Sequence, residues 1–357
     1  MHIPDGYLSP ETCGVMAAAM VPVWTTAGKR VRKVVTSRSV PLLALGAAYS
    51  FLVMMFNVPI PDGTTAHAVG AVLIAILLGP WAAVVAVSVA LAIQALFFGD
   101  GGVLAFGANC FNMALVMPMV GYAVYRSATR NLSLTAPRRA FWAGIAGYVG
   151  LNAAALCTAI EFGLQPTLFH SANGTPLYAP FHLSQTIPAM ALAHLTIAGA
   201  VELVLTAGVI TYLQRANLPV LRINHPGVAE VEDGSSPRRL GWRWGAISLG
   251  VAALLTPLGL LASGGAFGED APKDLDLAKY HLQAVPNGLA HYAGFWHNAF
   301  FDGYDFSHDK HPALGYVVSA LVGIAAIAIV VVASLLLIGV GRRRHSTSEA
   351  SIGSAGA

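Results

Sequence analysis

Long apolar segments alternate with short polar ones along nearly the whole chain. A helix that crosses a membrane needs about 20 mostly apolar residues. Segments of this kind predict nine membrane-spanning helices, at about residues 10–28, 40–58, 66–79, 81–98, 103–125, 141–161, 186–213, 242–262 and 313–340. The third is the shortest, and only Gly79 and Pro80 separate it from the fourth. The pattern therefore predicts an all-α polytopic membrane protein.

The spacing of the apolar segments divides the chain into two units. Residues 1–214 hold a seven-helix block, and residues 242–340 hold two further transmembrane helices joined by a long external loop at about 263–312. Between the units, residues 215–241 are rich in Pro, Gly and charge, which is typical of a flexible cytoplasmic connector. The tail, 341–357, has low complexity and is expected to be disordered.

Composition supports a chain that lies mostly in the lipid bilayer. Hydrophobic residues make up 56% of it and charged residues only 10%, where a soluble domain carries about 25% charged residues. The net charge is only +3, and the basic residues form short clusters between apolar segments, so no nucleic-acid partner is expected. The three cysteines, Cys13, Cys110 and Cys157, lack CxxC spacing, so we expect small core residues rather than a disulfide or a thiolate site.

The basic clusters predict how the chain is oriented, because loops rich in Lys and Arg stay in the cytoplasm. With nine spans, four clusters fall on one side of the membrane. They are Lys29, Arg30, Arg32, Lys33 and Arg38; Arg126, Arg130, Arg138 and Arg139; Arg215, Arg222, Arg238 and Arg239; and Arg342, Arg343 and Arg344. The N-terminus is therefore expected outside and the C-terminus in the cytoplasm.

The first ten residues, MHIPDGYLSP, carry candidate metal chemistry. The Met1 amine, the His2 backbone nitrogen and the His2 Nδ1 can bind one metal ion together, since they close a five-membered and a six-membered chelate ring. A planar set of nitrogens favours Cu(II) or Ni(II), and its formation releases protons. Pro4 and Gly6 are expected to bend this segment back into the protein.

A fourth nitrogen is expected from His67 in the external loop NVPIPDGTTAHAVG. This histidine stands at the start of the third span, on the same side as Met1, where an ionisable group is a candidate functional residue. His2 comes just before the turn Pro4-Asp5-Gly6, and His67 comes shortly after the turn Pro61-Asp62-Gly63. The alternatives are a chance histidine at position 2 and a hydrogen-bonded helix cap at position 67.

Several motifs resemble one known family. MHIPDGYLSP, PIPDGTTAH, LLGPWAA, QALFFGDGG and FGANCFNMA occur in family order within about residues 1–125, and the span pattern fits to about 214. Together they are similar to the CbiM/NikM family, the substrate-binding membrane subunit of cobalt and nickel energy-coupling-factor transporters. Asp62 and Ala66 depart from the family pattern, but neither is a ligand position.

The resemblance implies a function and partners. It implies a substrate-capture subunit of an ATP-driven Ni²⁺ or Co²⁺ importer in a bacterial or archaeal cytoplasmic membrane, without an organic cofactor. The implied metal ligands are the Met1 amine, the His2 amide and imidazole, and His67. The implied partners are a transmembrane coupling protein and cytoplasmic ATPase subunits.

The C-terminal unit resembles the two-span accessory component of these systems. Its segment VPNGLAHYAGFWHNAFFDGYDFS is similar to a degenerate Pro-Asp-Gly-Leu-Glu motif, which reads Pro286-Asn287-Gly288-Leu289-Ala290 here. The loop that contains it also holds five of the chain's 12 histidines, with aspartates near the last of them: His281, His291, His297, His308 and His311, with Asp302, Asp305 and Asp309. They either capture metal at the surface or belong to a polar loop that packs on the first block.

A few polar residues interrupt the apolar spans. For Asn109, interhelical hydrogen bonding and orientation of His2 or His67 are both open, whereas Gln94 and Asn112 favour interhelical bonding. Glu202 is expected either to pair with a partner subunit or to face a cavity. His194 is expected to be a hydrogen-bonded core residue rather than a ligand.

Two other functions compete with an importer subunit. The chain lacks the GxxxxGK[ST] pattern that binds ATP phosphates, so its energy has to come from elsewhere and it is not expected to be an enzyme. A self-sufficient carrier or channel is the main alternative, although only Glu202 is a deeply placed carboxylate. An intramembrane metalloenzyme would need an open coordination position and a nearby base. The donor set favours nickel, but nickel and cobalt both remain open.

Overall fold

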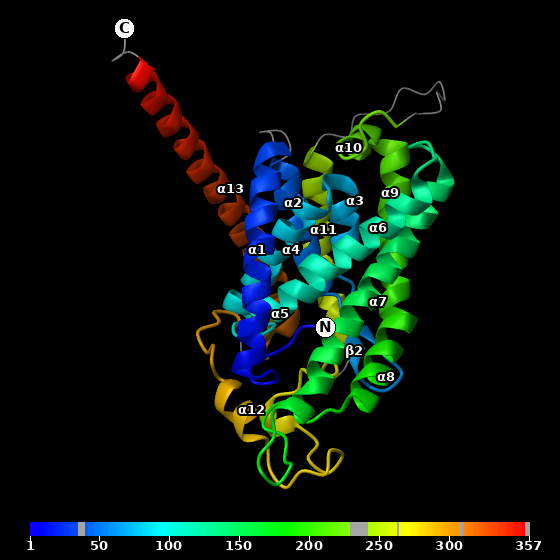
Figure 1. Ribbon diagram of the computed structural model, residues 1–357. Coiled ribbons are helices and arrows are strands. Elements are labelled where there is room, and N and C mark those ends of the chain that lie inside the picture. The colour runs from blue at the N-terminus through cyan, green and yellow to red at the C-terminus, as the bar shows by residue number, and fades with distance from the viewer. Residues whose placement is uncertain (35–39, 229–241, 263, 307–309, 354–357) are drawn as a thin grey trace.

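The computed structural model is a helical bundle with loops folded over one end (Figure 1). It describes residues 1–34, 40–228, 242–262, 264–306 and 310–353. One small antiparallel sheet is present, in which β1 (Val58–Pro59) pairs with β2 (Thr65–Ala66). The expected all-α class is confirmed.

Helical segments follow the expected spans in order. The first unit contains α1 (Pro10–Val34), α2 (Val40–Met54), α3 (Ala71–Leu78), α4 (Pro80–Phe98), α5 (Phe106–Asn109), the π-helix η1 (Cys110–Val116), α6 (Met117–Thr129), α7 (Pro137–Leu168), α8 (Leu183–Ala193), the π-helix η2 (His194–Ala198), α9 (Gly199–Ala216) and α10 (Leu218–Arg222). The second contains α11 (Trp242–Leu255), the 3-10 helices η3 (Thr256–Leu261), η4 (Pro272–Asp274) and η5 (Asp302–Tyr304), α12 (Asn287–Tyr292) and α13 (Pro312–Gly353).

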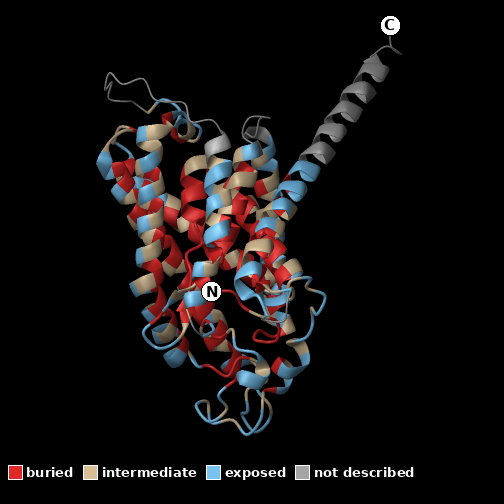
Figure 2. Cartoon of the chain, turned by 180° about the vertical axis from the view of Figure 1, so that it is seen from behind, coloured by how far each residue is buried: buried red, intermediate tan, exposed pale blue. Residues whose placement is uncertain are grey.

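Within the described ranges, five helices are long and apolar enough to cross a membrane. They are Pro80–Phe98, Phe106–Thr129, Pro137–Leu168, Leu183–Ala216 and Pro312–Ser334. Two further apolar helices, Pro41–Met54 and Gly245–Leu261, are shorter. Large side chains such as Val204, Leu254 and Ile329 are more than 60% exposed on the outside of the bundle, while its interior is buried (Figure 2). An apolar exterior of this kind fits a lipid environment.

The expected third span, 66–79, differs from the others because it is only partly helical. α3 covers Ala71–Leu78, about 12 Å of helix. The residues before it form a buried loop inside the bundle, with β2 at its start. Asn224 Nδ2 donates to the Ala75 and Ile76 carbonyls in the last turn of α3, and the Ala75 carbonyl also accepts from the Gly79 N–H. The segment therefore places His67 deep in the protein.

Small residues allow α7 to pack closely against α6 and α9. A Cβ atom added at Gly144 would lie 2.9 Å from the Leu203 carbonyl oxygen, and one at Gly150 would lie 2.6 Å from the Met117 carbonyl oxygen. Such small-residue contacts bring helix backbones together in membrane proteins. The first unit is built around this contact.

The second unit packs on the first at two places. α11 and α13 lie against α2, and α13 also contacts α4. The connecting loop folds over the end of the bundle opposite α10 (Figure 1). There, Leu275 and Leu289 share a buried core with Tyr7, Phe162 and Phe181. The loop therefore packs on the first block.

Two expected boundaries stay predictions. α13 continues to Gly353, past the expected boundary at 340, and disorder of the tail is not tested. Residues 229–241 of the expected connector lie outside the described residues, as do Arg38, Arg238, Arg239, His308 and Asp309.

Gly70 offers a test of this packing. It has φ +72°, and an added Cβ would lie 2.4 Å from Tyr49 Cε1, whereas Gly63 has φ +84° with open space around it. Both Gly→Ala variants incur about 1–2 kcal/mol of left-handed strain, and Gly70→Ala adds about 1–3 kcal/mol of overpacking. We expect Gly70→Ala to lower the apparent melting temperature of the purified protein clearly more than Gly63→Ala. Equal losses would contradict the close contact with Tyr49.

Candidate metal centre

The N-terminal segment runs into the bundle instead of lying on its surface. Met1, His2 and Ile3 are at most 4% exposed, and Tyr7 and Ser9 are buried as well. A polar main chain in such surroundings needs hydrogen-bond partners, because an unpaired buried amide costs free energy. The partners of this segment therefore define the site.

Asn109 pairs with the main chain of Ile3 in both directions. Its Oδ1 accepts from the Ile3 N–H at 2.8 Å, and its Nδ2 donates to the Ile3 carbonyl at 3.1 Å. The Gly102 N–H donates to the same carbonyl at 2.8 Å. Of the two roles open for Asn109, the structure therefore supports orientation of the N-terminal segment.

Asp5 fixes the turn that follows. Its carboxylate accepts from the N–H groups of Val103, Leu104 and Ala105 at 3.1, 2.8 and 3.3 Å. Burial raises the pKa of Asp5 above its usual value, and these three bonds oppose the shift. Gly6, at φ +90°, lies so close to α12 that an added Cβ would be 2.7 Å from the Leu289 carbonyl oxygen. The Pro-Asn-Gly-Leu-Ala segment of the second unit therefore supports the turn of the first.

His67 meets His2 inside the bundle. Their ring centroids are 4.9 Å apart, with the rings tilted by 33°. His67 Nδ1 lies 3.0 Å from the Ala68 carbonyl, which can only accept, so Nδ1 carries the proton and Nε2 has a free lone pair. His67 is buried, and its Nε2 has no hydrogen-bond partner among the described residues. His67 therefore presents an unpaired nitrogen lone pair in the interior of the protein.

Glu202 and Ser50 hold the loop that carries His67. Glu202 Oε2 accepts from the Val69 and Gly70 N–H groups at 2.8 and 3.0 Å, and Ser50 Oγ donates to the Val69 carbonyl at 2.8 Å. Glu202 is fully buried. Its carboxylate thus lies in the interior of its own chain and positions the residues that follow His67.

Two carboxylates lie beside the nitrogens of Met1 and His2, and neither was predicted from the sequence. The Met1 ammonium lies 3.2 Å from Glu269 Oε1, which comes from the loop of the second unit. His2 Nδ1 lies 3.1 Å from Asp100 Oδ1. No sequence pattern marks Glu269, whereas Asp100 lies in the GDGG turn that follows α4.

The remaining predicted amides, Gln94 and Asn112, differ in whether their hydrogen bonds reach the site. Gln94 Nε2 donates to Asp100 Oδ2 and to the Tyr304 hydroxyl, at 3.1 and 2.9 Å, so it contacts the carboxylate that holds His2. Asn112 instead donates to Thr158 Oγ1 and Glu161 Oε2, at 3.1 and 2.7 Å. Gln94 is thus connected to the site, and Asn112 links two helices as expected.

Side chains alone do not form a metal site here. Among the described residues, no group of three or more His, Cys, Asp or Glu side chains is arranged to hold a metal ion. Met1, His2 and His67 are brought together, however, and the first two add main-chain nitrogens to their donors. A chelate at this place would therefore depend on the peptide backbone.

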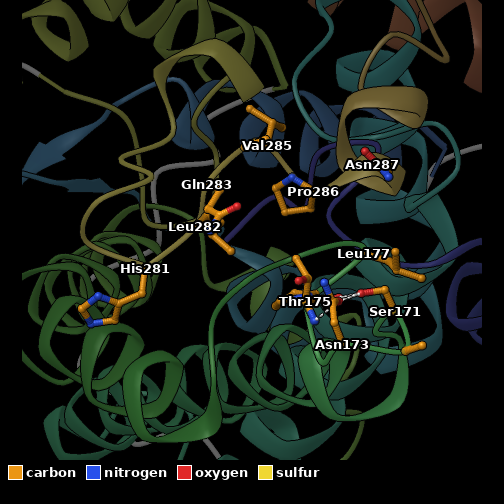
Figure 3. A pocket seen from close by; sticks show the side chains of 13 residues that line it. Ser171, Asn173, Thr175, Leu177, His281, Leu282, Gln283, Val285, Pro286 and Asn287 are labelled. Carbon is orange, nitrogen blue, oxygen red and sulfur yellow. Dashed lines mark hydrogen bonds between the residues drawn. The ribbon is translucent and has the colours of Figure 1, made fainter.

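The histidine-rich loop offers a different environment. His281, His291 and His297 are exposed. His281 lines a surface cavity of about 740 Å³ between the two units, together with Asn173, Thr175, Gln283 and Asn287 (Figure 3). The lining combines one imidazole with amide, hydroxyl and apolar groups. Such a cavity lacks the clustered donors of a metal-capture site.

Known proteins match this chain in its N-terminal part and along nearly its whole length. Residues 2–219 match CbiM, the family described as cobalt uptake substrate-specific transmembrane region. The chain belongs to the CbiM family. A solved structure of a truncated transition metal transporter is 60% identical, with a TM-score of 0.56, and the match covers 60% of this chain and 98% of that one.

Relatives of this CbiM-family chain also share its C-terminal unit. The fused nickel transport protein NikMN of Rhodobacter capsulatus is 49% identical over 92% of this chain and 95% of its own length. The probable fused nickel transport protein LarMN of Lactiplantibacillus plantarum is 46% identical over 91% of this chain and 94% of its own. Both matches extend far beyond residue 219, so the family resemblance with a fused C-terminal region is confirmed.

The two buried asparagines provide a matched test of the site. Asn109→Ala removes both bonds to Ile3, so we expect nickel affinity to fall by about 10- to 100-fold. Asn112→Ala, on the same helical stretch, should leave affinity within about a factor of three, since the hydrogen bonds of Asn112 go to Thr158 and Glu161 on α7. Isothermal titration of the purified variants checks this. Equal losses would mean that the amides act only through helix packing.

Glu202 allows a second test. Glu202→Ala leaves two buried N–H groups without an acceptor, at a cost of about 1–3 kcal/mol each, and should lower both the apparent melting temperature and nickel affinity. Glu202→Gln retains an acceptor oxygen and should stay near wild type in both measurements. If the glutamine variant lost as much as the alanine variant, the charge rather than the hydrogen bonds would matter.

Proposed function

We propose that this chain is the substrate-capture subunit of an ATP-driven importer of Ni²⁺ or Co²⁺. The metal is held by the Met1 amine, the His2 amide and imidazole, and His67 Nε2. The observation that carries this proposal is the burial of the N-terminal segment with His2 beside His67, at a ring separation of 4.9 Å. The names of the relatives, which are nickel and cobalt transport proteins, support the same substrates.

The chain's own residues prepare the donors. In the structure the Met1 ammonium faces Glu269 and His2 Nδ1 faces Asp100. For the chelate to form, the ammonium and the His2 amide each lose one proton. The proton that His2 Nδ1 shares with Asp100 moves to Nε2 or to solvent, and Nδ1 then turns from Asp100 to the metal. His67 needs no such step, because its Nε2 is already unprotonated. Binding therefore releases protons and replaces the contacts with Glu269 and Asp100 by metal bonds.

Nickel fits this donor set better than cobalt. Nitrogens in one plane favour the square geometry of Ni(II). The two relatives that match along nearly the whole chain are named as nickel transport proteins. Nickel is therefore the preferred substrate in this proposal, with cobalt as the second.

Energy comes from partner subunits, since the sequence lacks a phosphate-binding GxxxxGK[ST] motif. Arg30, Arg126 and Arg215 all lie near helix termini at the α10 end of the bundle. By the positive-inside rule this end faces the cytoplasm, and it is the end at which we place the coupling protein and its ATPases. The metal then enters from the opposite end, under the loop of the second unit.

An uptake experiment tests this function. Cells that express the chain with coupling and ATPase subunits should accumulate radioactive ⁶³Ni²⁺, and uptake should fall to background when the ATPases are inactivated. Uptake that persisted without the ATPases would favour the self-sufficient carrier.

An N-terminal extension supplies the matched site control. Three residues added before Met1 move the amine away from the site, and uptake should be lost although the protein remains in the membrane. The same three residues after Ala357 should have no effect. A single added residue is avoided, because a histidine in third position forms a nickel chelate of its own. Normal uptake by the extended protein would refute the amine as a ligand.

A further inference from the structure

His194 has a feature that an ordinary core histidine lacks. It is 2% exposed, and its Nδ1 lies 2.8 Å from the Met190 carbonyl. A carbonyl can only accept, so Nδ1 carries the proton and Nε2 has the lone pair. That Nε2 is buried, and no described residue donates a hydrogen bond to it. A buried acceptor without a donor is rare in native structures and calls for an explanation.

The same arrangement occurs at His67. There too the Nδ1 proton goes to a main-chain carbonyl, and a buried Nε2 has no partner within the part of the chain that the structure describes. A histidine that binds metal commonly donates its other ring N–H to a carbonyl in this way, which fixes the tautomer and aims the lone pair. Both imidazoles are therefore prepared as metal ligands.

His194 also lies next to the site. It begins the π-helix η2, which packs against β1 and β2, and β2 leads directly into His67. His194 is close enough to interact electrostatically with His67 and with the Met1 ammonium. π-Helical turns are uncommon and occur frequently at functional sites, because they shift a side chain out of the regular helical pattern. Here the shifted side chain is an imidazole beside the candidate metal centre.

The order of binding follows from the state of each donor. The Met1 amine and the His2 Nδ1 are engaged with carboxylates, and the His2 amide still has to lose a proton. His67 and His194 can bind at once through neutral Nε2 atoms. The four donors of the final chelate are already assigned to Met1, His2 and His67, so His194 is not counted among them. Among the described side chains, His194 does not form a three-ligand cluster with His67 and His2.

We propose that His194 is a loading ligand: with His67 it takes the metal ion on two Nε2 lone pairs before the N-terminal chelate closes. This inference rests on the proposed function of the same site. It makes metal capture a two-stage process, in which a fast complex with two imidazoles passes the ion to the slower chelate.

His194→Asn separates loading from final binding. The asparagine amide can still donate to the Met190 carbonyl but has no counterpart of Nε2. His225→Asn is the matched control, because His225 Nδ1 makes the same contact with a carbonyl four residues earlier, at 2.9 Å from Leu221. His225 follows α10, which lies at the end of the bundle away from the loop of the second unit (Figure 1). Purified full-length proteins are mixed with NiCl₂ in a stopped-flow instrument. The rise of the absorption band of planar four-nitrogen Ni(II) gives the loading rate, and metal analysis gives the final content.

We expect His194→Asn to slow loading by about 10-fold or more, with an unchanged band and final nickel content, and His225→Asn to load like wild type. Loading of His194→Asn at the wild-type rate would overturn the inference. So would a changed final band, which would place His194 in the final site. If wild type bound no nickel at all, the proposed function would fail as well, which distinguishes the two failures.

A second measurement uses the wild-type protein and does not depend on how the variant folds. Cu²⁺ serves as a paramagnetic probe, and samples are frozen at successive times after mixing. An early signal with couplings to two imidazole nitrogens should precede the final planar signal. If the final signal formed directly, without an early species, the loading role would be excluded.

Discussion

The two-way hydrogen bond between Asn109 and the main chain of Ile3 is the interaction on which the site depends. It allows an N-terminal segment to enter an apolar bundle, where peptide groups are stable only when they are paired. Asp5 and Gly102 extend the same pairing along the segment. Once the segment is fixed in this way, His2 can only face the interior, and the bundle around it has to leave room for a chain end.

Much of the fold could be predicted because lipid imposes a simple rule on sequence. Apolar segments of sufficient length form helices there, and the spans from 81 to 213 appear as expected. The segment 66–79 shows the limit of this rule. Composition encodes burial but not conformation. The residues of this segment before α3 form a loop in which the Val69 and Gly70 N–H groups donate to Glu202. A partner more than 130 residues away leaves no local signal in the sequence.

The candidate site, too, could be predicted from the sequence only in part. Met1, His2 and His67 could be named from their donor atoms and from motifs close to them in the sequence. Glu269 could not, since it lies 268 residues from its partner and in no recognisable pattern. His194 was assigned to the core, and it is indeed hydrogen-bonded there. What the sequence could not reveal is that only one of its two ring nitrogens is satisfied.

The loop of the second unit belongs to the same polypeptide as the first unit, and this covalent connection has a consequence of its own. Thr65 pairs with Gly265, Tyr7 bonds to the Asp270 carbonyl, and α11 and α13 anchor both ends of the loop on α2. On a separate polypeptide these contacts would form only as fast and as often as two proteins meet in the membrane. In one chain the loop acts at an effective concentration in the millimolar range, set by tether length and not by expression level. Every copy of the candidate metal centre thus has its own covering loop, in a ratio fixed by the gene.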